Sequence, residues 1–169
     1  VTVDSEAAIK EARDAYNALE LRQKKLVTNY DVLVAAEAAL EAAKENAVII
    51  KAVEDKIAAI GEVTYTSASK IKIDLARAAY DALDDELKAS VSNYEVLTAA
   101  EARYAELKAE QEDAAAVAPV IAKINAIGKV TINSKALIEA AEAAYAELTE
   151  SQKALVTNYD VLVAARAAY

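Results

Sequence analysis

The sequence of 169 residues lacks cysteine, histidine, methionine, tryptophan and phenylalanine, and it has only two glycines and one proline. Without cysteine there is no disulfide framework and no thiolate ligand for zinc. Without histidine there is no imidazole base, no Ser-His-Asp triad and no common ligand set for transition metals. Two glycines cannot build a phosphate-cradling loop or a dinucleotide fingerprint. We therefore predict that the protein is not an enzyme and has no cofactor, and we name no catalytic, cofactor-binding or metal-binding residue.

Positive charge is also scarce, because the 19 lysines and arginines are outnumbered by 28 aspartates and glutamates and the net charge is −9. A nucleic-acid-binding surface needs clustered lysine and arginine, yet the densest group here is Arg22, Lys24 and Lys25. No apolar run approaches the ~20 residues of a membrane span, and no basic segment precedes an apolar stretch. We predict neither a nucleic-acid partner nor membrane insertion. The chain begins with valine, which we interpret as a piece of a longer protein.

What the sequence does contain is a tandem repeat. The segment Leu26–Ala36 recurs letter for letter as Leu155–Ala165, and a looser copy lies between them at Ser90–Ala100. The only two glycines, Gly61 and Gly128, both follow Ala-Ile and both stand one residue before Val-Thr. The repeat period is therefore about 64–67 residues.

Each copy of the repeat predicts three helices. The first helix carries an apolar stripe, and the glycine after it is expected to take a left-handed conformation. The stripe consists of Val48, Val53, Ile57 and Ile60 before Gly61, and of Val117, Val120, Ile124 and Ile127 before Gly128. The second helix carries a stripe of an isoleucine, an alanine, a tyrosine and a leucine. Its members are Ile9, Ala12, Tyr16 and Leu19, then Ile73, Ala76, Tyr80 and Leu83, then Ile138, Ala141, Tyr145 and Leu148. A capping box at Thr149–Gln152 predicts the start of a short helical turn. Three further capping boxes predict the start of the third helix in each copy, at Thr28–Asp31, Ser92–Glu95 and Thr157–Asp160.

The junctions between copies predict long helices that neighbouring copies share. No glycine or proline occurs from Thr28 to Ile60, so this stretch can form one continuous helix of roughly 50 Å. In the next junction Pro119 and three extra residues predict a helix that is bent or broken. The expected fold is all-α, an elongated rod of tandem three-helix-bundle repeats.

The repeat also predicts where the copies begin and end. The first copy, residues 1–45, lacks its first helix. The second copy, residues 46–112, is complete, and the third, residues 113–169, is truncated in its last helix. In the first copy this arrangement leaves an apolar groove uncovered, lined by Ile9, Tyr16, Leu33 and Leu40.

These motifs resemble helical tandem repeats of Gram-positive bacterial cell-surface proteins, which are three-helix, spectrin-like modules similar to those called Found In Various Architectures. The resemblance rests on Ala59–Thr64, on Ala76–Leu83 and on the pair Asn93-Tyr94, and it covers essentially the whole chain. It implies an extracellular protein at the cell surface or cell wall whose other domains bind or catalyse. The third copy departs from the pattern, because Glu142 stands where the other copies have Arg13 and Arg77. We therefore expect this arginine to serve no shared site.

Two further features could indicate a binding site or could be purely structural. Stacked tyrosines can bind sugars or bases, but six of the nine recur in the copies, so we expect them to pack in the core with the hydroxyl at its rim. Tyr65 does not recur, and neither does Leu21, so both are expected to be exposed. The acidic clusters Asp84–Glu86 and Glu110–Asp113 lack the alternating ligands and central glycine of a calcium loop, so we interpret both as solvated helix surface.

Two functions remain after these exclusions. The first is a structural spacer that holds other domains of the same protein away from the cell wall. The alternative is a helical adhesion module that binds a host or matrix protein through one helix face. A designed consensus protein would explain the narrow composition, but the insertions near Ser67 and before Pro119 make the periods unequal. The expected partners are neighbouring repeats and domains of the same protein and, for the alternative, a host protein.

Overall fold

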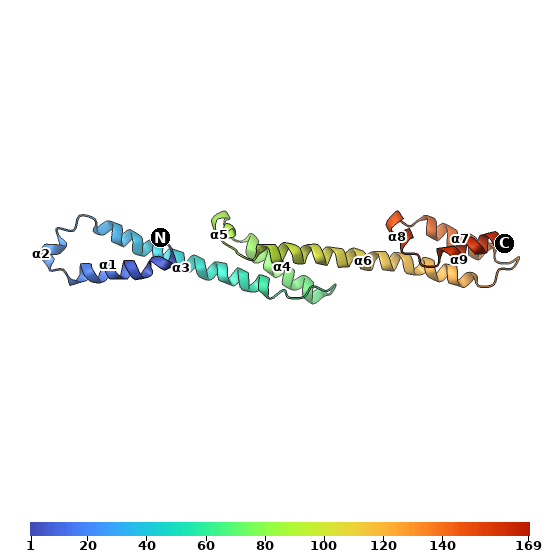
Figure 1. The fold of residues 1–169 in the computed structure, drawn as a ribbon, viewed down its shortest axis with the longest axis horizontal. Helices are drawn as coiled ribbons and strands as arrows, with labels where there is room; N and C mark the ends of the chain where they lie inside the picture. The colour runs from blue at the N-terminus through green and yellow to red at the C-terminus, as the bar shows by residue number, and fades with distance from the viewer. The chain divides into compact units, whose positions relative to one another are not determined.

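The computed structural model describes all 169 residues as an all-α protein with nine α-helices and no strands (Figure 1). The chain divides into two compact units, residues 1–101 and 102–169. A short 3-10 turn, η1 (Val3–Ser5), precedes the first helix. The helices are α1 (Glu6–Ala18), α2 (Leu21–Lys24), α3 (Tyr30–Ala58), α4 (Ser67–Asp81), α5 (Asp85–Ala89), α6 (Tyr94–Ile127), α7 (Lys135–Ala146), α8 (Glu150–Ala154) and α9 (Tyr159–Ala168).

In the first unit the long helix α3 contacts two helices in succession. Its first part lies beside α1 and its second part beside α4 (Figure 1). The helix has 29 residues without a break, which confirms the prediction of one continuous helix in this stretch. In its second part, Val53 is 4% exposed and Ile57 is fully buried.

In the second unit the apolar side chains of several helices form one core. Val117, Val120, Ile124 and Ile127 come from the second part of α6 and repeat at helical spacing. They pack against Ile138 and Ala141 of α7 and against Leu162 and Ala165 of α9. Ile124 and Ile138 are fully buried.

Helix α6 excludes one of the two outcomes predicted for Pro119, the broken joint. The chain stays helical through this residue, so the joint is not broken. A proline inside a helix removes the hydrogen bond to the carbonyl four residues earlier. That carbonyl belongs to Ala115, and both Ala115 and Pro119 are exposed, so water can take the place of the lost donor.

Both glycines take the left-handed conformation that the repeat predicts, with φ of +65° at Gly61 and +57° at Gly128. A Cβ atom at either position would meet nothing within 4 Å, so a larger residue is opposed by backbone strain alone.

From this geometry we expect Gly61→Ala to lower the free energy of unfolding by about 1 kcal/mol, because a non-glycine residue is strained at positive φ. Gly61→Asn is the matched control and should lower it less, because asparagine tolerates this conformation better. Urea titration followed by circular dichroism measures both. An alanine variant as stable as the unsubstituted protein would contradict the expectation.

None of the nine helices is both long enough and apolar enough to cross a membrane.

Candidate functional site

The most regular side-chain arrangement is a pair of stacked tyrosines that occurs once in each copy. One ring comes from the second helix of the copy and its partner comes from the first turn of the third helix. The ring centroids are 4.2 Å apart for Tyr16 and Tyr30, 4.3 Å for Tyr80 and Tyr94, and 4.1 Å for Tyr145 and Tyr159. These offset-stacked contacts tie the two helices together at the same point in every copy.

The tyrosines lie at the edge of the core and none is fully buried, which corrects the prediction of core packing in part, since Tyr145 does pack against the core of the second unit. Five of the six rings are only half-buried, and Tyr159 is exposed at 41%. The core positions are taken instead by the aliphatic residues of the same helices, such as Ile73 and Leu97 in the second copy. Each tyrosine covers one ring face with its partner, so the pair is a contact between helices at the surface.

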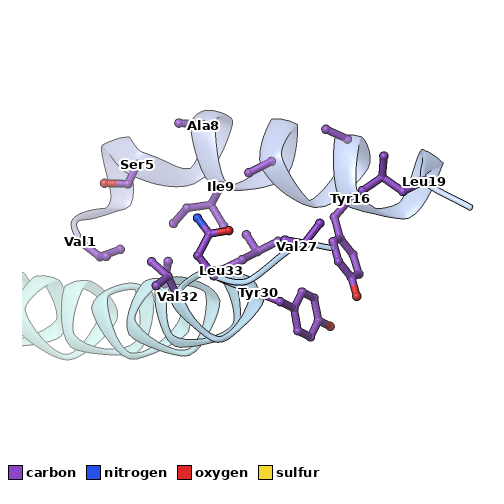
Figure 2. A pocket seen from close by; sticks show the side chains of 14 residues that line it. Val1, Ser5, Ala8, Ile9, Tyr16, Leu19, Val27, Tyr30, Val32 and Leu33 are labelled. Atoms are coloured by element: carbon purple, nitrogen blue, oxygen red, sulfur yellow. The ribbon is translucent and has the colours of Figure 1, made fainter. Parts of the chain in front are cut away.

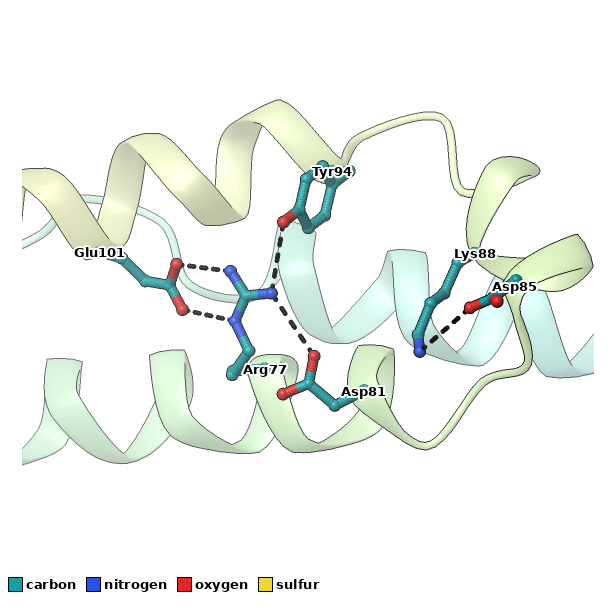
Figure 3. A network of polar contacts seen from close by, with 6 residues as sticks. All are labelled: Arg77, Asp81, Asp85, Lys88, Tyr94 and Glu101. Atoms are coloured by element: carbon teal, nitrogen blue, oxygen red, sulfur yellow. Dashed lines mark hydrogen bonds and ion pairs between the residues drawn. The ribbon is translucent and has the colours of Figure 1, made fainter.

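An arginine and a glutamate form an ion pair beside each tyrosine pair. In the second copy, Arg77 on α4 donates from Nε and Nη2 to the two carboxylate oxygens of Glu101 on α6, at 2.7 and 2.5 Å (Figure 3). Its Nη1 donates to the Tyr94 hydroxyl at 3.4 Å and lies 3.6 Å from Asp81. This bidentate geometry is the strong form of an arginine–carboxylate contact. It fixes the register of α4 against α6.

The first copy has the same ion pair, and the third copy has it with the charges exchanged. Arg13 on α1 donates to Glu37 on α3 through Nε, at 2.5 Å, and through Nη2, and to the Tyr30 hydroxyl at 3.1 Å. In the third copy the acidic residue is Glu142 on α7 and the arginine is Arg166 on α9, again joined through Nε, at 2.7 Å, and Nη2. At Glu142 the departure from the pattern therefore exchanges the charges of the ion pair and keeps the ion pair itself.

The ion pairs of the first and third copies hold their carboxylates in the charged form. Hydrogen bonds from Arg13 lower the pKa of Glu37 below its ordinary value, and those from Arg166 do the same for Glu142. The pKa of Glu54 is lowered by hydrogen bonds from the side chain and backbone of Ser92. Each of these groups favours the folded state while it is ionised.

These shifts predict that the protein loses stability in acid. The unfolded-state pKa of such a glutamate is near 4.5, and the folded-state value is lower. Their contribution is therefore present above about pH 4.5 and is lost as the pH falls through the folded-state pKa values. Urea unfolding should show a constant free energy above about pH 5 and a decline below about pH 4. A Glu142→Gln control should flatten this decline, and an equally stable protein at low pH would contradict the assignment.

The two acidic clusters pair with their own neighbours. In the first cluster, Asp84 caps α5 by accepting from the Leu87 backbone N–H at 2.9 Å. In the second, Glu110 lies 3.3 Å from Arg103, and Asp113 accepts from the Gln152 side chain at 2.9 Å. No group of three or more carboxylates is placed where it could hold a metal ion.

An apolar groove lies between α1 and the first part of α3, with a volume of about 520 Å³. Ile9 from α1 and Leu33 from α3 point toward each other in it, and Tyr16 and Tyr30 lie at one end (Figure 2). This agrees with the predicted groove except at Leu40, which is 6% exposed and lies outside the lining. Leu21 and Tyr65, expected to be exposed, are 81% and 42% exposed.

Sequence reasoning misjudged the residues that start the third helices. The capping boxes predicted at Thr28 and Thr157 do not form, because the helices begin at Tyr30 and Tyr159 and the preceding asparagines make no capping bond. In the third copy, Asn158 donates instead to the Ile121 carbonyl of the neighbouring helix at 3.1 Å. The box predicted at Thr149 does form.

No protein-family model, curated protein or solved structure matches this chain. Its function is therefore inferred from the arrangement of its helices and from the tyrosine pairs and ion pairs on its surface.

Proposed function

We propose that this protein is a non-catalytic spacer of a bacterial cell-surface protein, built of tandem three-helix repeats that form an elongated rod. The observation that carries the proposal is α3, an unbroken helix whose first part packs on α1 and whose second part packs on α4. A helix shared by two bundles leaves no flexible linker between them. Stiffness of this kind is what a stalk needs to hold a domain at a distance.

The repeated side-chain contacts support the same proposal. Stacked tyrosines and a bidentate ion pair recur in all three copies and join helices within the copy. These contacts lie on the surface and link helices to each other. Contacts of this kind stabilise the arrangement of the helices, which is what a spacer requires. The location outside the cell, the assignment to Gram-positive bacteria and the division into copies at 1–45, 46–112 and 113–169 belong to this proposal.

Small-angle X-ray scattering tests the rod directly. A compact protein of this length has a radius of gyration of about 15 Å, whereas the proposed rod should exceed about 20 Å. A value near that of the compact protein would overturn the proposal.

Spin-label distances test the stiffness, and the absence of cysteine makes the labelling clean. Labels at the exposed positions Glu95 and Lys123 of α6 lie 28 residues apart, so a straight helix predicts a narrow distribution near about 42 Å. Labels at Asp31 and Lys51 of α3, a helix without proline, are the control and predict about 30 Å. If the label-to-label distances were short or broadly distributed in α6 but not in α3, the result would indicate a hinge at Pro119.

The groove between α1 and α3 favours adhesion as a second candidate function. An exposed apolar groove between two helices can accept a helix of a host or matrix protein. Binding to an immobilised matrix protein that Ile9→Asp abolishes and Val48→Asp leaves unchanged would support this candidate. Equal binding by both variants would reject the groove as the adhesive surface.

A further inference from the structure

The floor of the groove is an exposed version of a surface that is buried in the other two copies. Ile9 and Leu33 in the first copy are half-buried. Their equivalents are Ile73 and Leu97, at 3% and 0% exposure, in the second copy, and Ile138 and Leu162, at 0% and 2%, in the third. The residue types are the same at both positions in all three copies. The difference in burial therefore comes from what lies over them.

In both other copies a helix with one particular apolar face lies over this surface. In the second copy it is the second part of α3 with the turn that follows it, where Val53, Ile57 and Ile60 are buried at 4%, 0% and 1% exposure. In the third copy it is the second part of α6, which buries Val120, Ile124 and Ile127 at 3%, 0% and 4%. The spacing is identical, with apolar residues at i, i+4 and i+7 on one side of the helix.

A polar contact accompanies this apolar face. Asn93, before the third helix of the second copy, donates from Nδ2 to the Glu54 carbonyl of the covering helix at 3.0 Å. Asn158 in the third copy donates to the Ile121 carbonyl at 3.1 Å. Both carbonyls belong to the residue that follows the first valine of the covering face. The equivalent residue of the first copy, Asn29, is exposed and lines the groove.

We propose that the groove of the first copy binds an amphipathic α-helix with valine or isoleucine at i, i+4 and i+7, the first helix of another repeat of this type. Asn29 Nδ2 then donates to the main-chain carbonyl of residue i+1 of that helix. A second copy of this chain offers no free helix of this kind, because its two helices with this face are already buried in their own repeats. This inference rests on the division into repeats of the proposed function and not on the spacer role, which scattering tests by itself.

The test extends the full chain with residues 46–62 placed directly before Val1. The junction then repeats the natural order, because Glu62 precedes Val63-Thr64 in the chain and would precede Val1-Thr2 in the extended protein. We expect hydrogen exchange of the α1 amides to slow by about tenfold or more as their helix becomes covered. In the extended protein, Asn29→Ala should reverse part of this protection, while in the original chain it should change nothing.

Matched variants within the added segment separate docking from a general effect of extra chain. Ile57→Asp in that segment should abolish the protection, since this residue is fully buried where it occurs naturally. Val48→Asp is the control, since Val48 is 70% exposed, and it should leave the protection intact. Unchanged exchange in α1 on extension, or equal effects of the two aspartates, would overturn the proposal.

Sedimentation of the original chain decides between this occupant and a second copy. We expect a monomer at micromolar concentration. A dimer that Ile9→Asp dissociates would show that a second copy fills the groove, and the proposal would be wrong.

Discussion

Leu97→Ala should lower the free energy of unfolding by about 2–5 kcal/mol, whereas Leu33→Ala should cost much less. The two leucines occupy the same position in two copies of the repeat, 64 residues apart. Leu97 is fully buried and Leu33 is half-buried in the groove. Truncating a fully buried leucine removes its transfer free energy and leaves a cavity, whereas a side chain at an open groove leaves space that water already fills.

Urea titrations with hydrogen exchange as a local readout measure this difference. Global melts are insufficient because the chain divides into two units and need not unfold in one step. Leu162→Ala is the second control, since Leu162 is 2% exposed, and it should resemble Leu97→Ala. If Leu33→Ala and Leu97→Ala lowered the free energy of unfolding equally, the groove of the first copy would be closed in solution.

The second large effect concerns the ion pair of the second copy. Arg77→Glu should lower stability by about 1–2 kcal/mol, because it removes a charge-assisted, partly screened contact and brings two carboxylates together. Glu101→Arg should also destabilise, by placing two arginines side by side. The double variant should recover part of the loss, because it restores the exchanged charges of Glu142 and Arg166 in the third copy but leaves the new carboxylate at position 77 near Asp81.

Urea titrations of the two single variants and the double variant, with hydrogen exchange of the α4 amides as the local readout, form a double-mutant cycle that isolates the pair. Lys70→Glu is a suitable control, since it also reverses a charge on α4 but disrupts only an exposed pair with Asp74. Its effect should be small. If the double variant were as unstable as the sum of the two single variants, the pair would not act as a unit.

The sequence was sufficient for the helices and insufficient for the contacts between them. The missing breakers predicted α3, and the two glycines predicted both left-handed turns, because these are local properties of the backbone. The tyrosine pairs were present as a constant spacing of 14 residues, but spacing alone does not show that the rings of two different helices meet. The tyrosine rings were predicted to lie in the core because tyrosine and isoleucine share a helix face, but the rings lie at the edge of the core.

The ion pairs could have been found by comparing two positions together. In every copy the charged residue on the second helix is followed 24 residues later by one of opposite sign, as in Arg13 with Glu37 and Glu142 with Arg166. Considered alone, Glu142 is a departure from the pattern. The capping boxes predicted at Thr28 and Thr157 failed for the opposite reason, because a local motif was given weight although the helices begin two residues later, at Tyr30 and Tyr159.

From the exchanged charges of the third copy we expect helices of different copies to be kept from pairing wrongly during folding. Leu26–Ala36 and Leu155–Ala165 are identical, so apolar contacts alone would let a third helix pair with the wrong second helix. If α9 packed on α4, Arg166 would meet Arg77, and if α3 packed on α7, Glu37 would meet Glu142. Like charges at this distance oppose both mistakes. The first two copies share one polarity and have no such protection against each other, so any exchange of helices in this chain should occur between them.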